Sequence, residues 1–243
     1  MNIKAQIPNL FTMLNLFCGC AAVVFVSYSE FGAAFLFVCL GIFFDFFDGF
    51  FARKFGVAGP LGVQLDSLAD MVTSGVVPGY VMYLMLMDTR NFLVLEWHHI
   101  VLPFIGFIIT LAACYRLAKF NIDTRQSDSF IGLPTPANAL FIMSLPLIGT
   151  ICEIEFIQNI LTNQLFLIAI TFLSAYVMNA EIPLFSLKIK DFSFAKYKLQ
   201  IFFLVISVLM LIFLQILAVP LIIILYILLS IINNKTVNKT VSV

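Results

Sequence analysis

Four aspartates lie between residues 45 and 70, in a stretch whose other residues are mostly apolar. An ionised carboxylate at membrane depth is costly without a partner, so carboxylates in such a stretch indicate a function. Mg²⁺ and Mn²⁺ are hard cations that prefer oxygen ligands, and they relieve the repulsion between clustered carboxylates. Two such cations suit phosphoryl chemistry, because they bind the phosphate oxygens and stabilise the departing one. We therefore expect a site for two divalent cations, Mg²⁺ or Mn²⁺, whose aspartate ligands are Asp45, Asp48, Asp66 and Asp70.

The spacing of the aspartates predicts two acidic helix faces. Asp45 and Asp48 are separated by three positions, and Asp66 and Asp70 by four, so each pair shares one face of a helix. A short connection at residues 56–60 contains glycine and proline and joins the two helices as an antiparallel pair. The two acidic faces can then oppose each other.

Small residues and an arginine accompany the carboxylates. Gly49, Ala52 and Gly62 lack bulk where a large ligand must approach the helix backbone. Arg53 can pair with phosphate or carboxylate through its planar guanidinium group. The whole pattern reads Asp-x2-Asp-Gly-x2-Ala-Arg-x8-Gly-x3-Asp-x3-Asp, which is too specific for a solvated interfacial loop.

This pattern resembles the motif of the CDP-alcohol phosphatidyltransferase family at every position. Members are integral membrane enzymes that transfer a phosphatidyl group from a CDP-linked lipid to an alcohol and release CMP. The resemblance implies that the four aspartates hold two metal ions and that Asp70 also acts as general base. It further implies a homodimer, and a cytidine diphosphate site lined by Gly49, Ala52, Arg53 and Gly62.

Three further segments, 7–12, 115–121 and 130–136, resemble membrane-embedded members that act as phosphatidylserine synthases. The implied activity is transfer of the phosphatidyl group from CDP-diacylglycerol to L-serine. Asn9 and Thr12, in the first segment, are candidate contacts for the CDP-linked lipid. The alternative for these two residues is that they cap the first helix.

The second segment provides candidate residues for the acceptor. Arg116 and Lys119 are separated by three positions at the cytoplasmic end of a predicted span, level with the carboxylates. They could bind the serine carboxylate or the lipid pyrophosphate, and Asn121 could add a polar contact. The alternative is that both cations are ordinary topology signals at the end of a span.

Composition indicates an all-α integral membrane protein. Hydrophobic residues make up 62% of the 243 positions, charged residues only 11%, and the mean hydropathy is +1.09. A net charge of zero argues against nucleic acid as a partner. We predict a single domain over residues 1–243, of which 1–150 form the catalytic portion and 151–243 additional membrane helices. The apolar stretches predict a bundle of about eight transmembrane helices, at residues 10–28, 31–52, 63–87, 99–118, 136–152, 161–179, 199–217 and 219–233.

The distribution of Lys and Arg predicts the orientation of these spans. With the N-terminus in the cytoplasm, only Arg90 of the 13 Lys and Arg residues falls outside, so both termini are expected to be cytoplasmic. The stretch 199–234 has no charge and is too long for one span, so we expect a tight turn near Pro220. The protein is then expected in the cell membrane with its active site facing the cytoplasm. CDP-diacylglycerol and other membrane lipid are its expected partners there.

Two alternatives to serine transfer remain at this stage. The same chemistry could use glycerol 3-phosphate or inositol phosphate as the acceptor, and the motif does not separate diacylglycerol from ether-linked donors. A carboxylate-coupled transporter is a more remote alternative. Transporters tend to place such groups near the membrane midplane within repeated halves, and this chain shows no second copy of the motif.

Overall fold

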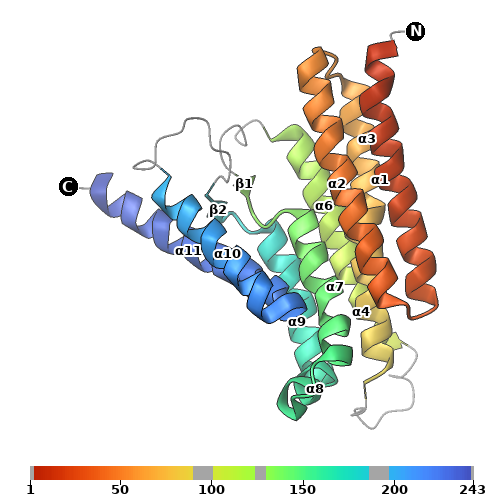
Figure 1. Cartoon of the computed structure of the whole chain (residues 1–243), viewed down its shortest axis with the longest axis vertical. Helices are drawn as coiled ribbons and strands as arrows, with labels where there is room; N and C mark the ends of the chain where they lie inside the picture. The colour runs from red at the N-terminus through yellow and green to blue at the C-terminus, as the bar shows by residue number, and fades with distance from the viewer. Residues whose placement is uncertain (1–2, 90–100, 124–129, 186–196, 242–243) are drawn as a thin grey trace.

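Helices account for most of the described residues, as the sequence predicts. The computed structural model describes residues 3–89, 101–123, 130–185 and 197–241, and Figure 1 shows their arrangement. Each predicted apolar span coincides with helix over nearly all of its described residues; the exceptions are the last residue of the spans 10–28 and 136–152 and the break at 162–163. In chain order the elements are α1 (Ile3–Ser27), α2 (Phe31–Phe55), α3 (Pro60–Asp70), η1 (Met71–Val76), α4 (Val77–Met87), η2 (Leu102–Phe107), α6 (Ile108–Ile122), β1 (Phe130–Ile131), α7 (Thr135–Ile151), α8 (Glu155–Leu161), α9 (Gln164–Asn179), β2 (Pro183–Leu184), α10 (Lys198–Leu214), η3 (Gln215–Leu217) and α11 (Ala218–Val241).

Helices α1 and α2 form a long antiparallel pair. Each has 25 residues, or about 37 Å at 1.5 Å per residue, which exceeds the ~30 Å hydrocarbon core of a bilayer. α2 ends at Gly56, whose positive φ of 63° allows the backbone to reverse. The N–H groups of Gly56 and Val57 donate to the carbonyls of Arg53 and Ala52, at 3.2 and 3.0 Å. This cap returns the chain directly into α3, which therefore runs antiparallel to α2.

A π-helical turn, η1, follows the acidic segment of α3 within one helical stretch, Pro60–Met87. Thr73, in this turn, donates its hydroxyl hydrogen to the backbone carbonyl of Asn15 on α1, at 3.1 Å. Thr110 on α6 likewise donates to the carbonyl of Gly75, at 2.9 Å. Side-chain donors of this kind compensate for the irregular backbone bonding of a π-helical turn. The turn thus connects α3 to α1 and α6, two further helices that carry predicted site residues.

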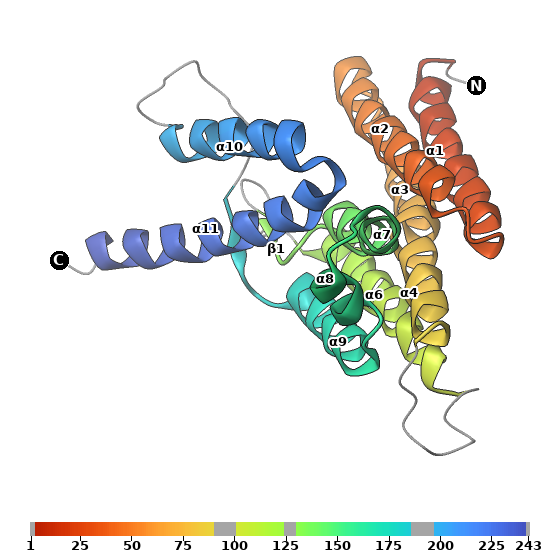
Figure 2. The ribbon, with the colours of Figure 1, turned by 60° about the horizontal axis from the view of Figure 1, so that its bottom comes forward.

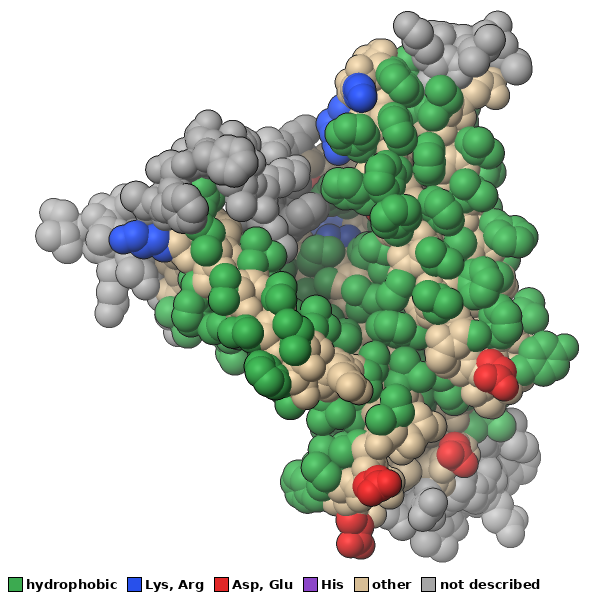
Figure 3. Space-filling model, in the orientation of Figure 1, with side chains coloured by type: hydrophobic (Ala, Val, Ile, Leu, Met, Phe, Trp, Pro, Cys, Tyr) green, Lys and Arg blue, Asp and Glu red, His purple; other side chains and the backbone are tan. Residues whose placement is uncertain are grey.

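The chain is a membrane protein. Five helical stretches are long and apolar enough to cross a membrane, or up to six if the bent pair α8 and α9 counts as one span. Their outer surface is mostly hydrophobic in Figure 3, where Lys and Arg side chains lie toward the upper end and Asp and Glu toward the lower end. α8 and α9 meet at 66°, a bend that the apolar pattern did not predict.

The C-terminal helices form a hairpin beside the rest of the bundle (Figure 2). The chain turns at Gln215, with φ 49° and ψ −124°, so the predicted turn exists but precedes Pro220. Pro220 lies in the first turn of α11, where a missing N–H group costs no helical hydrogen bond.

The core lies among α4, α6, α7 and α9, and the acidic segments lie toward one end of it. Met82, Ile109, Ile142 and Leu167 are fully buried there. The described residues depart from an all-helical fold in one two-stranded antiparallel sheet, in which β1 pairs with β2. This small sheet connects the segment before α7 to the segment after α9.

Candidate active site

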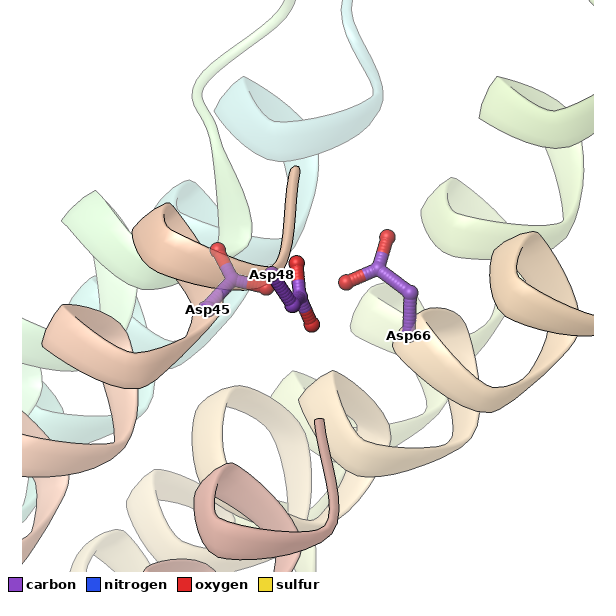
Figure 4. A group of neighbouring side chains, drawn as sticks. All are labelled: Asp45, Asp48 and Asp66. Carbon is purple, nitrogen blue, oxygen red and sulfur yellow. The ribbon is translucent and has the colours of Figure 1, made fainter. Parts of the chain in front are cut away.

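Three of the predicted carboxylates converge between α2 and α3. Oxygen atoms of Asp45, Asp48 and Asp66 all lie within 4.8 Å of one another, and Figure 4 shows the side chains facing each other. The reversal at Gly56 produces this arrangement, because it brings the end of α2 against the start of α3. The predicted opposition of the two acidic faces is confirmed.

The fourth carboxylate, Asp70, is held from α1. Asp70 is 8% exposed, and the side-chain amide of Asn15 donates a hydrogen bond to its Oδ1 at 3.0 Å. In parallel, the hydroxyl group of Thr12 donates to Oδ2 of Asp48 at 2.6 Å. One face of α1 therefore contacts both acidic helices. Since α1 begins at Ile3, the capping interpretation of Asn9 and Thr12 is wrong: both lie inside the helix.

The chemistry of these donors fits divalent cations. Among the described residues, no lysine or arginine forms an ion pair with any of the four carboxylates. Asp70 and Asp45 also repel each other electrostatically, as do Asp70 and Asp66. Clustered, desolvated carboxylates that form no ion pair with a lysine or arginine can be stabilised by Mg²⁺ or Mn²⁺, which prefer oxygen ligands.

A cavity of about 290 Å³ opens beside the carboxylates, between α1, α2 and α3. Its volume is just below the ~300–1,000 Å³ that is usual for small-molecule sites. Asp48 and Asp66 form part of its wall. The structure also places in this wall all six residues predicted for the CDP-linked lipid, namely Asn9, Thr12, Gly49, Ala52, Arg53 and Gly62.

The two motif glycines have different surroundings. A Cβ atom at Gly49 would lie 3.3 Å from Nη1 of Arg53, so the glycine lets the guanidinium group fold back along α2. A Cβ atom at Gly62 would meet only Oδ1 of Asn9 within 4 Å, at 3.9 Å. Gly62 therefore keeps the cavity open, whereas Gly49 accommodates a neighbouring side chain.

Of the three predicted acceptor residues, Arg116 and Asn121 interact with residues of α3, whereas Lys119 pairs with a residue outside the acidic helices. Arg116 is 7% exposed, its charge attracts Asp70, and its Nε atom has no hydrogen-bond partner in the described part of the chain. Asn121 exchanges hydrogen bonds with Ser67 on α3, at 2.9 and 3.2 Å. Lys119 does not pair with the aspartates but forms an ion pair with Glu181, at 3.6 Å.

Sequence reasoning missed three polar residues of this region: Asn15, Ser67 and Glu181. Asn15 is an amide within the apolar part of α1, and its position three residues after Thr12 was a usable signal. Ser67 directly follows a motif aspartate. No sequence pattern marked Glu181 as a site residue. It meets Lys119 only because the chain passes α6 again after α9.

The chain resembles known proteins over most of its length. A protein from Bacillus subtilis (strain 168), named CDP-diacylglycerol–serine O-phosphatidyltransferase, is 39% identical over 134 residues, covering 54% of this chain and 69% of that protein. A protein of the same name from Helicobacter pylori (strain ATCC 700392 / 26695) is 30% identical over 210 residues, covering 86% and 81%. An archaetidylserine synthase from Methanothermobacter thermautotrophicus is 32% identical over 152 residues, covering 61% of each chain.

The family profile described as CDP-alcohol phosphatidyltransferase matches residues 5–232, which include the acidic cluster, the cavity and the α6 cations. The relatives and the profile thus agree with the motif between residues 45 and 70. The chain belongs to the CDP-alcohol phosphatidyltransferase family, a family of phosphotransferases.

Proposed function

We propose that this protein transfers the phosphatidyl group of CDP-diacylglycerol to the hydroxyl group of L-serine, forming phosphatidylserine and releasing CMP. The observation that carries the proposal is that Asp48 and Asp66 belong to the carboxylate cluster and also line the cavity. A CDP-linked lipid in that cavity would present its phosphates to the cluster. The names of the relatives from Bacillus subtilis and Helicobacter pylori supply the donor and the acceptor.

The cavity would bind the nucleotide end of the donor. Arg53 can pair with a phosphate through two parallel hydrogen bonds, and Asn9 offers an amide to the base or ribose. Thr12 keeps Asp48 oriented toward the cluster through its hydrogen bond. Gly49, Ala52 and Gly62 let the ligand approach the backbone of α2 and α3.

Asp45, Asp48, Asp66 and Asp70 would hold two divalent cations, Mg²⁺ or Mn²⁺. When bound, these ions would neutralise the phosphate oxygens and the negative charge that develops on the departing CMP. Asp70 would accept the proton of the serine hydroxyl, directly or through a water molecule. The serine oxygen then bonds to the phosphorus that carries diacylglycerol, and the bond from that phosphorus to the CMP oxygen breaks. The hydrogen bond from Asn15 fixes Asp70 for this task.

The acceptor would bind on the α6 side of the cluster. Arg116 lies near Asp70, so its guanidinium group can receive the serine carboxylate and draw the hydroxyl group toward that base. Lys119, one turn further along α6, adds a second positive charge, and Asn121 adds an amide.

The membrane arrangement agrees with these substrates. We infer a single domain over residues 1–243 with eight spans and both termini in the cytoplasm, residues 1–150 forming its catalytic portion. The site would then face the cytoplasm from the cell membrane. Acyl chains would remain in the inner leaflet, while serine and the nucleotide reach the site from the aqueous side. Family resemblance further suggests a homodimer, and the net charge of zero argues against nucleic acid as a partner.

Filling the cavity from α3 should weaken donor binding without harming the fold. We expect Gly62→Leu to raise the KM for CDP-diacylglycerol at least about tenfold, because the new side chain projects into the space beside Asn9. The melting temperature should not fall, since leucine favours helix more than glycine does. Gly32→Leu is the control, because that glycine lies at the start of α2 with only Leu147 nearby, at 4.0 Å. Equal KM values for both variants would contradict the nucleotide assignment.

A panel of acceptors tests the proposed reaction. Purified protein would receive CDP-diacylglycerol and Mg²⁺ or Mn²⁺, with L-serine, glycerol 3-phosphate, inositol phosphate or no acceptor, and released CMP would be measured. We expect release with serine alone. Release only with a phosphorylated acceptor would keep the family chemistry and reject serine. A parallel series with a CDP-linked ether lipid tests the donor, since one relative is named archaetidylserine synthase.

A further inference from the structure

One ion pair borders the proposed acceptor site from outside the motif. Nζ of Lys119, on α6, lies 3.6 Å from Oε1 of Glu181, which follows α9. The two side chains are 34% and 65% exposed, so water and small solutes can reach both. Lys119 lies one helical turn from Arg116, whose charge attracts Asp70. The pair therefore lies one turn along α6 from a cation that interacts with the proposed base.

The segment that carries Glu181 is fixed by backbone hydrogen bonds. The N–H of Gly132 donates to the carbonyl of Ile182, at 2.9 Å, and Gly132 packs so closely that a Cβ atom there would overlap the carbonyl of Met178. The amide of Asn179 donates to the carbonyl of Ala112 on α6, at 3.1 Å. These contacts hold the segment against α6 without help from the ion pair. An exposed ion pair also contributes little to stability by itself.

We propose that Glu181 binds the α-ammonium group of L-serine while Lys119 and Arg116 bind its carboxylate. This inference rests on the proposed function. A serine zwitterion carries the same two charges as the Lys119–Glu181 pair, so it can enter between them and satisfy both. The Nε atom of Arg116, buried and without a hydrogen-bond partner in the described structure, is a further donor for the carboxylate.

The proposal explains acceptor choice through charge. A phosphorylated alcohol would bring a second negative charge beside Glu181 and would be repelled, although Arg116 and Lys119 alone would favour it. 3-Hydroxypropanoate has the carboxylate of serine but lacks its ammonium group. When this acceptor is bound, Glu181 would face no positive charge from the ligand. Glu181 thus determines which acceptor is used, and it lies outside the sequence motif.

The test compares Glu181→Gln with the wild type, using serine and 3-hydroxypropanoate as acceptors. We expect the variant to lower kcat/KM for serine at least about tenfold, through KM. The preference for serine over 3-hydroxypropanoate should fall by a similar factor, while the KM for CDP-diacylglycerol stays unchanged. Glu153→Gln is the matched control, because Glu153 is exposed in the connection after α7 and should leave every constant unchanged.

A second variant separates binding from a structural role. The double exchange K119E/E181K restores the ion pair but reverses its polarity, so serine can no longer bind in the productive direction. The proposal predicts a wild-type melting temperature with kcat/KM for serine still reduced at least about tenfold. Recovery of serine turnover in this double variant would overturn the proposal, as would an equal loss for both acceptors in Glu181→Gln. If the wild type turns over other acceptors but not serine, the proposed function itself fails, and the inference fails with it.

Discussion

Replacing Asp70 with asparagine is expected to lower CMP release by at least about a thousandfold, since it removes both a general base and a charged metal ligand. The fold should persist, because the substitution keeps a side-chain oxygen that can accept the hydrogen bond from Asn15. It also removes one negative charge from a group of carboxylates that repel one another. The measurement is kcat with saturating serine and CDP-diacylglycerol, together with the melting temperature.

Asp88→Asn is the control for this experiment. Asp88 is exposed directly after α4, beyond the end of the helical stretch that carries Asp70. Its replacement should leave turnover unchanged. Turnover close to the wild type in Asp70→Asn would remove that residue as the base and would contradict the proposed mechanism.

Removing divalent cations is expected to abolish turnover, and adding Mg²⁺ or Mn²⁺ should restore it. The reason is that the carboxylates of Asp45, Asp48 and Asp66 lie within 4.8 Å of one another and form no ion pair with a lysine or arginine among the described residues. A ligand that binds only the folded state stabilises it by roughly 2.7 kcal/mol when its concentration is 100 times its Kd. Titration with Mg²⁺ or Mn²⁺ should therefore raise the melting temperature of the protein in the absence of substrates.

Asp66→Asn provides the variant for this prediction. It should raise the metal concentration for half-maximal turnover at least about tenfold and abolish most of the thermal shift, because it removes a charged ligand from the centre of the cluster. Full activity after exhaustive chelation, or an unchanged thermal shift in Asp66→Asn, would contradict a metal role for the cluster.

The sequence predicted the helices and the motif residues because both depend on local patterns. Long apolar runs predict helix in a membrane, and the spacing of the aspartates assigns each pair to one helix face. A glycine turn at Gly56 then suffices to bring Asp48 and Asp66 together. The grouping of Gly49, Ala52, Arg53 and Gly62 follows from the same local geometry, whereas Asn9 and Thr12 reach the cavity because α1 packs against α2 and α3. The binding roles of all six residues remain predictions.

Features that depend on distant partners were not predictable in this way. Asn15 bonds to Asp70 across 55 positions, and only its polarity within an apolar helix marks it. The 66° bend between α8 and α9 and the early turn at Gln215 depend on how the helices pack rather than on periodicity. Lys119 was predicted beside the aspartates, yet it turns toward Glu181, which no local pattern connects to it.

The most direct test of the proposed function is the stoichiometry between CMP and lipid-bound serine. Purified protein would be given CDP-diacylglycerol, radiolabelled L-serine and Mg²⁺ or Mn²⁺, and both products would be counted over time. We expect one CMP for each serine found in the lipid fraction, with neither product formed by Asp70→Asn. CMP release without label in lipid would indicate hydrolysis or another acceptor, and it would contradict the transfer to serine proposed for this chain.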